Sequence, residues 1–339
     1  MKVTPIFFAM EEEERENRFQ PETPYQLRPF EERPFSFFSG ARIWLNVVLF
    51  VVTVFSTFFV GISHSLSFEY GEVLSRNPDL NLDLSRIITP EIIYLSIIYA
   101  VVLIGILLGH EFGHYLACRH YSINATLPYF IPAPTLIGTL GAFIKIKSPI
   151  TRKQHLFDIG IAGPLTGFIL SFPALAYGLS LSKVVPPLPE GGAIMFGEPL
   201  LLKILGTLVI KDIPSGYDVL IHPIAFAGWV GILVTSFNLF PVGQLDGGHI
   251  SYALFGQKSG LAARVFLYLF FFMGVVFWVG WFIWAFIILV LGMKHPRIID
   301  EATPLSPRRK IMAFVALLIF ILSFIPAPIK GYSLLDIFK

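Results

Sequence analysis

Two histidines and a glutamate occur close together in an apolar stretch of the chain, as His110-Glu111-Phe112-Gly113-His114. Positions four apart on an α-helix lie on the same face, so both imidazoles can bind one metal ion. Glu111 lies beside them, where its carboxylate can take a proton from a metal-bound water. The residue types and their spacing therefore predict a hydrolytic metal centre.

Hydrogen bonding between helices is the alternative role for these three side chains. The stretch around them is apolar enough to lie in a bilayer, where an ionisable side chain is costly and therefore rare without a purpose. Polar contacts between helices do not require zinc-ligand spacing, so we favour the metal centre. His110 precedes Arg119 by nine residues, which places the metal roughly 13 Å inside that end of the helix.

A zinc hydrolase needs a third protein ligand and leaves one position for water. Asp246, in the segment 238–248, is the outstanding candidate. Pro241 ends the preceding apolar span, and Gly247 and Gly248 let the backbone fold tightly beside the carboxylate. The alternative is that Asp246 only caps the following helix, a common role of aspartate. The spacing alone leaves both interpretations open.

The composition indicates an integral membrane protein. Of 339 residues, 55% are hydrophobic and 14% are charged, and the mean hydropathy is +0.71. Soluble domains have roughly 25% charged residues, so a chain this apolar can bury its surface only in lipid. A net charge of +2 gives no reason to expect a nucleic-acid partner, and the single cysteine, Cys118, excludes an intrachain disulfide framework.

The apolar stretches predict an all-α polytopic fold with about seven transmembrane helices. The run 262–293 is too long for one typical span, and we expect it to cross twice with a turn near 274–280. A polar loop is expected between residue 240 and this run. The predicted spans are 43–64, 91–118, 159–181, 219–240, two within 262–293, and 311–324, with a short surface helix at 199–210.

Positive residues cluster at 119–153 and again at 294–310. Both clusters lie on the cytoplasmic side only if 262–293 crosses twice. We therefore expect a multi-pass protein of the cell membrane with its N-terminus inside. The acidic 65–90 loop is expected outside and the metal centre near the cytoplasmic face.

Residues 121–155 differ from the spans in composition. They contain Pro128, Pro132 and Pro134, and residues 142–147 alternate like a strand. We predict a short re-entrant β element near 121–150, since irregular backbone is tolerated at membrane depth only where protein or water satisfies it. An ordinary cytoplasmic loop is the alternative.

These motifs together resemble the site-2 protease family, whose members combine a membrane-embedded HExxH helix with a later NxxPxxxxDG segment. Both patterns stand intact here, at 110–114 and 238–247. The Gly-Pro-Leu-Thr-Gly sequence at 163–167 and the stretch 138–143 are also similar to family elements. The resemblance covers about residues 92–250. Many bacterial members carry a PDZ domain, and no loop here is long enough to hold one.

The resemblance implies one zinc ion per chain, held by His110, His114 and Asp246, with Glu111 as general base. It implies that Asn238 holds the scissile peptide or its oxyanion, and that transmembrane proteins are the substrates, cut within or near their membrane segments. The substrate-side strand would bring Gly138, Leu140, Gly141 and Phe143 beside the substrate.

We expect four segments along the chain. They are a flexible cytoplasmic polar tail at 1–41, the first transmembrane helix and external loop at 42–91, the catalytic membrane core at 92–250, and additional C-terminal transmembrane helices at 251–339. The tail is acidic and lacks the features of a signal or transit peptide.

Two other function classes remain. A membrane transporter or channel with a buried His/Glu/Asp ion pathway would need more than one charged layer, and the sequence has one dense cluster plus Asp246. A catalytically silent binding protein would have lost Glu111 or a ligand, and this chain has not. The sequence leaves the substrate identity and the oligomeric state open.

Overall fold

A computed structural model describes residues 43–77, 87–189, 195–210, 213–292 and 298–337. The predicted tail at 1–41 lies outside the described residues. Helices dominate the described part of the chain, together with two short two-stranded sheets. The prediction of a mostly helical fold with a small β element is confirmed.

Four helical stretches are long and apolar enough to cross a membrane, and the chain is a multi-pass membrane protein. They are α2 (Ile43–Arg76), α4 (Pro90–His120), α5 (Lys153–Ser180), and Asp246–Val276, which comprises α8 (Asp246–Phe255), the 3-10 turn η2 (Gly256–Lys258) and α9 (Ser259–Val276). The shorter helices are α6 (Leu200–Val209), α7 (Pro223–Asn238), α10 (Gly280–Leu291), α11 (Pro307–Ser323) and α12 (Leu334–Ile337).

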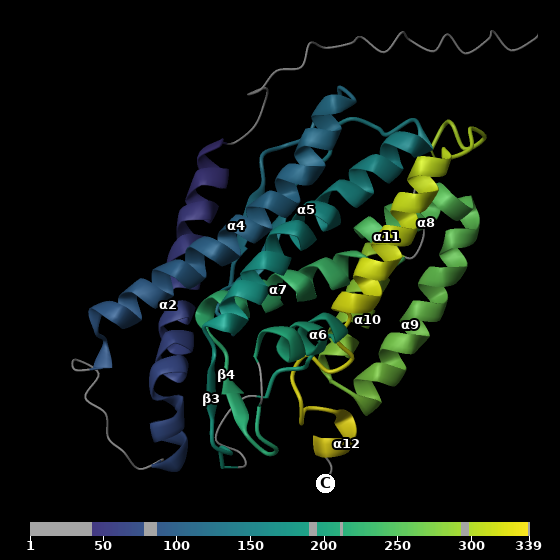
Figure 1. Cartoon of the computed structure of the whole chain (residues 1–339). Helices are drawn as coiled ribbons and strands as arrows, with labels where there is room; N and C mark the ends of the chain where they lie inside the picture. The colour runs from purple at the N-terminus through teal and green to yellow at the C-terminus, as the bar shows by residue number, and fades with distance from the viewer. Residues whose placement is uncertain (1–42, 78–86, 190–194, 211–212, 293–297, 338–339) are drawn as a thin grey trace, which may run out of the picture. The chain divides into compact units, whose positions relative to one another are not determined.

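Helix α4 carries the two histidines. Thr89 caps its first turn by accepting a hydrogen bond from the N–H of Ile92, and Pro90 begins the helix where a backbone N–H is not needed. The helix packs against α2, α5 and α7 (Figure 1). The predicted span 91–118 is confirmed.

Helices α5 and α7 approach each other closely at two glycines. A Cβ atom on Gly178 would lie 2.1 Å from the backbone nitrogen of Ala225, and one on Gly228 would lie 2.5 Å from that of Leu175. Small residues allow this contact between apolar helices. The largest cluster of buried apolar side chains lies around α7, between α4 and α5.

The segment after α7 contradicts the expectation of a polar loop, because residues 246–255 form α8. A Cβ atom on Gly247 would lie 2.0 Å from the carbonyl oxygen of Leu239, and one on Gly248 would lie 2.4 Å from that of Gly243. The two glycines therefore let α8 begin directly against the end of α7. This close turn fixes the first residue of α8 near α4.

Three other predicted boundaries are wrong. Helix α2 continues to Arg76 instead of ending at residue 64, so 65–76 do not belong to an external loop. Its buried face continues through Ser65, whose hydroxyl lies 3.3 Å from that of Ser96 on α4. Helix α5 begins at Lys153 instead of 159. Helix α7 begins at Pro223 instead of 219 because β4 (Asp218–Leu220) pairs with β3 (Lys183–Val185).

The turn predicted within 262–293 is confirmed. Helix α9 ends at Val276 and α10 begins at Gly280, and the two helices pack against each other. The N–H groups of Phe277 and Trp278 both donate to the carbonyl oxygen of Met273, which closes α9 at this point.

The two positively charged segments, 119–153 and the described part of 294–310, lie at the same end of the helices. The N–H of Asp300 donates to the carbonyl of Thr151 at 2.9 Å, and Lys153 Nζ donates to the carbonyl of Glu301 at 2.9 Å. Arg309 Nη2 lies 2.6 Å from Asp158 Oδ2. If residues 262–293 cross the membrane twice, the two positive segments must lie on the same side, as they do here.

A β-hairpin connects α4 to α5. Strands β1 (Tyr129–Pro132) and β2 (Thr139–Phe143) pair antiparallel, with Tyr129 opposite Phe143. The strand predicted at 142–147 lies earlier than expected. Beyond Phe143 no regular strand continues in the segment before α5, where isolated bridges join Ile146 to Ala125 and Arg152 to Asp300.

Candidate metal centre

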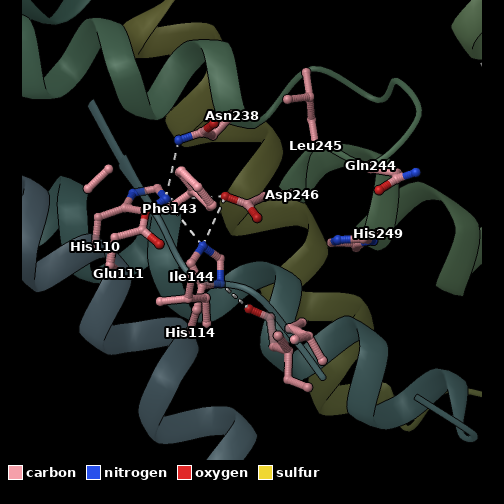
Figure 2. Close-up of a pocket in the computed structure, with 13 residues that line it drawn as sticks. His110, Glu111, His114, Phe143, Ile144, Asn238, Gln244, Leu245, Asp246 and His249 are labelled. Carbon is pink, nitrogen blue, oxygen red and sulfur yellow. Dashed lines mark hydrogen bonds and ion pairs between the residues drawn. The ribbon is translucent and has the colours of Figure 1, made fainter. Parts of the chain in front are cut away.

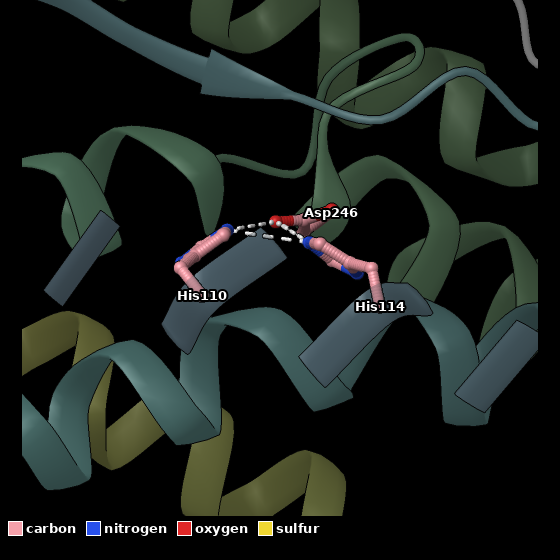
Figure 3. A group of neighbouring side chains, drawn as sticks. All are labelled: His110, His114 and Asp246. Carbon is pink, nitrogen blue, oxygen red and sulfur yellow. Dashed lines mark hydrogen bonds and ion pairs between the residues drawn. The ribbon is translucent and has the colours of Figure 1, made fainter. Parts of the chain in front are cut away.

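Two histidines from α4 and an aspartate from the start of α8 converge (Figure 3). The Nε2 atoms of His110 and His114 lie 3.2 Å apart, and each lies 3.2 Å from Asp246 Oδ2. His110 is 3% exposed and His114 is 7% exposed. The structure therefore places both imidazoles on one helix face, as predicted, and brings Asp246 to them.

The three ligand atoms fit a tetrahedral zinc ion. Bonds of about 2.0 Å at tetrahedral angles place ligand atoms about 3.3 Å apart. Two unprotonated imidazole nitrogens and a carboxylate oxygen repel one another at 3.2 Å, unless a cation or a proton lies between them. Two nitrogens and one oxygen are also a donor set that zinc takes in hydrolases.

The orientation of His114 is fixed from α5. Its Nδ1 lies 2.7 Å from the carbonyl oxygen of Ile159. A carbonyl can only accept, so Nδ1 carries the proton and Nε2 keeps its lone pair directed at the centre. His110 Nδ1 is buried and has no hydrogen-bond partner in the described part of the chain.

Two glycines of α5 make room for the imidazoles. A Cβ atom on Gly163 would lie 2.0 Å from His114 Nε2, and one on Gly167 would lie 2.9 Å from His110 Nδ1. The Gly-Pro-Leu-Thr-Gly sequence thus allows α5 to approach the metal-binding face of α4. The glycines act through packing, since they contribute no ligand.

We expect Gly163→Ala to displace His114 and to lower the zinc content of the purified chain well below that of the wild type. The added methyl group overlaps the imidazole nitrogen that would bind the metal. Elemental analysis of detergent-purified protein measures this. Gly105→Ala on α4 is the matched control, because its Cβ atom meets nothing within 4 Å. Equal zinc in both variants would contradict the proposed position of the metal.

The alternative role of Asp246 as a helix cap is not supported by the geometry. Leu245 occupies the cap position of α8, and Asp246 is the first helical residue. The Asp246 carboxylate lies at the two histidines, and its side chain is 13% exposed. The contacts therefore favour a ligand.

A pocket of about 230 Å³ opens beside the three ligands (Figure 2). Glu111 lines it and is 6% exposed. The backbone N–H of Ile144, just after β2, donates a hydrogen bond to the Glu111 carboxylate. The carboxylate is thus held at the wall of a cavity that could admit water.

Asn238, the last residue of α7, lines the same pocket. Its Nδ2 lies 3.2 Å from His110 Nε2. The side-chain amide therefore presents a hydrogen-bond donor next to the three ligands. Its role at the scissile peptide or oxyanion, which the resemblance implies, stays a prediction.

The predicted substrate-side residues are dispersed along β2. Phe143 lines the pocket, while Leu140 is 69% exposed. A Cβ atom on Gly138 would lie 2.7 Å from the Cα atom of Thr57 on α2, and one on Gly141 would meet nothing within 4 Å. Among these four residues, the structure brings only Phe143 to the pocket.

Some pocket residues are not predictable as part of the site from the sequence. The backbone groups of Ile144 and Ile159 contribute, and no side-chain pattern marks them. Gln244 and His249 line the pocket on the side of Asp246. Their place beside the DGG turn is the only signal that could have identified them.

Most of the buried ionisable side chains in the described ranges lie at this site. The carboxylate, lysine, arginine and histidine side chains classed as buried there are His110, Glu111, His114 and His222. His222 accepts a hydrogen bond from Ile224 N–H at the start of α7, which is a capping role. The described residues therefore contain one cluster of buried charge, whereas a transporter pathway requires more than one charged layer.

Residues 98–281, which include all of these pocket residues, match peptidase family M50. Proteins with related sequences include two that bear the name "Probable zinc metalloprotease EGY1, chloroplastic". The chain is 36% identical to that of Oryza sativa subsp. japonica over 225 residues, which are 63% of this chain and 38% of the relative.

The Arabidopsis thaliana protein of the same name is 30% identical over 301 residues, which are 83% of this chain and 53% of the relative. "Probable zinc metalloprotease EGY2, chloroplastic" of Arabidopsis thaliana is 32% identical over 155 residues, 44% of this chain and 27% of the relative. The chain thus spans about half the length of these relatives or less.

Proposed function

The chain belongs to peptidase family M50, and from that premise we propose that it is an intramembrane zinc endopeptidase. It would hydrolyse peptide bonds within or near the transmembrane segments of other membrane proteins. The observation that carries the proposal is the buried group of His110, His114 and Asp246 beside Glu111, inside apolar helices.

His110, His114 and Asp246 would hold one zinc ion per chain. When bound there, zinc supplies Lewis acidity that polarises the scissile carbonyl and acidifies water. The Glu111 carboxylate takes a proton from the attacking water and later delivers it to the leaving amine. Asn238 Nδ2 donates a hydrogen bond to the carbonyl oxygen as negative charge develops on it.

Substrates must reach the pocket in an extended form, because a helix keeps its carbonyls in internal hydrogen bonds. We propose that strand β2 receives the extended segment by strand addition, with Gly138, Leu140, Gly141 and Phe143 along the contact. Phe143 at the pocket supports this path.

We propose seven crossings, made by α2, α4, α5, α7, α9, α10 and α11, with the β1–β2 hairpin as a re-entrant element. The segments are those expected from the sequence: 1–41, 42–91, 92–250 and 251–339. The N-terminus and the metal centre would face the cytoplasm of a cell membrane. The shared end of the two positive segments supports this orientation.

The orientation can be tested with single cysteines on a Cys118→Ser background. We expect Thr303→Cys to react with a membrane-impermeant maleimide from the cytoplasmic side, and Tyr332→Cys to react from the opposite side. Both residues are exposed in the structure. Reaction of both from one side would contradict the odd number of crossings between them.

The activity can be tested with single-span reporter proteins reconstituted with the zinc-loaded chain. We expect cleavage of a reporter whose transmembrane helix carries a central Gly-Pro pair, since this pair unwinds the helix locally. A matched polyleucine reporter should remain largely intact. Failure to cleave any such reporter would overturn the proposed function.

A further inference from the structure

The backbone around the β1–β2 hairpin has more hydrogen-bond acceptors than donors. Residues 127–139 include Pro128, Pro132 and Pro134, each of which keeps a carbonyl but has no N–H. Carbonyls at bilayer depth need a donor from protein or water. The hairpin therefore requires donors from elsewhere in the fold.

Four side chains on α2 and α4 supply these donors. Asn46 Nδ2 donates to the carbonyls of Leu127 and Pro128 at 3.0 and 2.9 Å. Ser56 Oγ donates to the carbonyl of Gly138 at 2.6 Å.

His64 Nε2 lies 2.8 Å from the carbonyl oxygen of Leu136, and Tyr99 Oη donates to that of Ile137 at 2.9 Å. A carbonyl can only accept, so Nε2 of His64 carries the proton in this contact. The four donors together satisfy five carbonyls.

The donors follow α2 across the membrane. Asn46 and His64 are about 27 Å apart along the helix at 1.5 Å per residue, which is close to the thickness of the hydrocarbon core. The tip of the hairpin at 136–138 contacts residues 56–64, in the middle of α2, and therefore lies deeper in the membrane than the contacts of Asn46. Its backbone packs directly on α2, since a Cβ atom on Gly138 (φ 88°) would lie 2.7 Å from the Cα atom of Thr57.

The other end of the hairpin contacts the metal centre. Strand β2 leads from Gly138 to Phe143 and Ile144, which line the pocket, and the N–H of Ile144 donates to Glu111. The five residues of β2 thus connect the tip of the hairpin to the backbone that contacts Glu111.

We propose that Asn46, Ser56, His64 and Tyr99 are positioning residues that fix β2 and Ile144 against the site by binding the hairpin carbonyls. Helix α2, all of which precedes the residues that match family M50, then forms part of the substrate-binding wall. The catalytic consequence rests on the proposed function, whereas the anchoring itself does not.

The test is the double variant Ser56→Ala/Tyr99→Phe, which removes two donors from neighbouring carbonyls and no other heavy atoms. In full-length protein in nanodiscs, we expect faster amide hydrogen exchange within 129–143 and unchanged exchange in α4 and α5. The zinc content should be unchanged, and kcat/KM for the Gly-Pro reporter should fall about tenfold, mainly through KM.

Two variants separate positioning from general destabilisation. Ser56→Thr keeps a hydroxyl donor and should restore hairpin protection in the Tyr99→Phe background. Thr53→Val removes a hydroxyl of α2 that bonds only to Leu49 in its own helix, and it should leave the hairpin unchanged. Faster amide exchange in all helices of the double variant would indicate general destabilisation. The single variant Tyr99→Phe would then be measured in its place.

Unchanged exchange within 129–143 in the double variant, or in Tyr99→Phe where that replaces it, would overturn the anchoring. Faster exchange with an unchanged KM would overturn the positioning role. If the wild type cleaves no reporter, the proposed function fails, and hydrogen exchange still decides whether these side chains hold the hairpin.

Discussion

In the Glu111→Gln variant we expect a full complement of zinc and a loss of reporter cleavage of roughly 10²–10⁴-fold. Glutamine has nearly the same shape and can still accept the hydrogen bond from Ile144 N–H through its carbonyl oxygen. It cannot take a proton from water. The change therefore removes proton transfer and leaves the three ligand atoms in place.

Zinc by elemental analysis and cleavage of the Gly-Pro reporter are measured on the same preparation. Glu91→Gln is the matched control, because Glu91 lies in the first turn of the same helix and outside the pocket. Cleavage at the wild-type rate by Glu111→Gln would assign the base to another residue. Loss of zinc from this variant would instead indicate that Glu111 is a ligand.

The metal centre could be predicted because its signals are local. His110 and His114 are four residues apart on one helix, and the helical period alone puts them on one face. The spacing alone allows Asp246 to be either a metal ligand or a helix cap, and only the folded arrangement favours the ligand. The sequence could thus indicate roles of side chains, but it could not indicate the roles of the Ile144 and Ile159 backbone groups.

The fold could be predicted where length and hydropathy determine it and not where packing does. The bounds of α4 agree with those of the apolar run at 91–118. Helix α2 extends beyond residue 64 because its buried face of small residues continues to pack along α4. Hydropathy does not detect such packing. Helix α8 was missed because Gly247 and Gly248, which read as a turn, instead permit close contact with the end of α7.

Strand β2 illustrates a third limit. The prolines and glycines indicated a break in helix, and the hairpin is there. The bounds of the strand were misplaced because residues 142–147 alternate like a strand, whereas the pairing with β1 ends where Tyr129 lies opposite Phe143. The donors on α2 are invisible in the sequence, since Asn46 and Ser56 have no recognisable relation to carbonyls about eighty residues later.

We expect Asp246→Ala to lower the affinity for zinc by at least about 100-fold. Loss of a residue that only hydrogen-bonds to a metal ligand already costs 10- to 100-fold in metal affinity, and Asp246 would be a ligand itself. His110 and His114 remain in place on α4, but two imidazoles do not complete the three-ligand site of a zinc hydrolase. Wild-type protein should contain about one zinc per chain after dialysis. The variant should contain much less and should not cleave the reporter.

Asp300→Ala is the control, since Asp300 is a partly exposed aspartate whose carboxylate accepts a hydrogen bond from Thr303 outside the pocket. Full zinc in Asp246→Ala would mean that another pocket group completes the site, and Glu111 is the other carboxylate lining that pocket in the described residues. The Glu111→Gln/Asp246→Ala double variant would then lose the metal. Wild-type protein without zinc would overturn the zinc chemistry of the proposal, and a different cation or a proton would have to lie between the three ligand atoms.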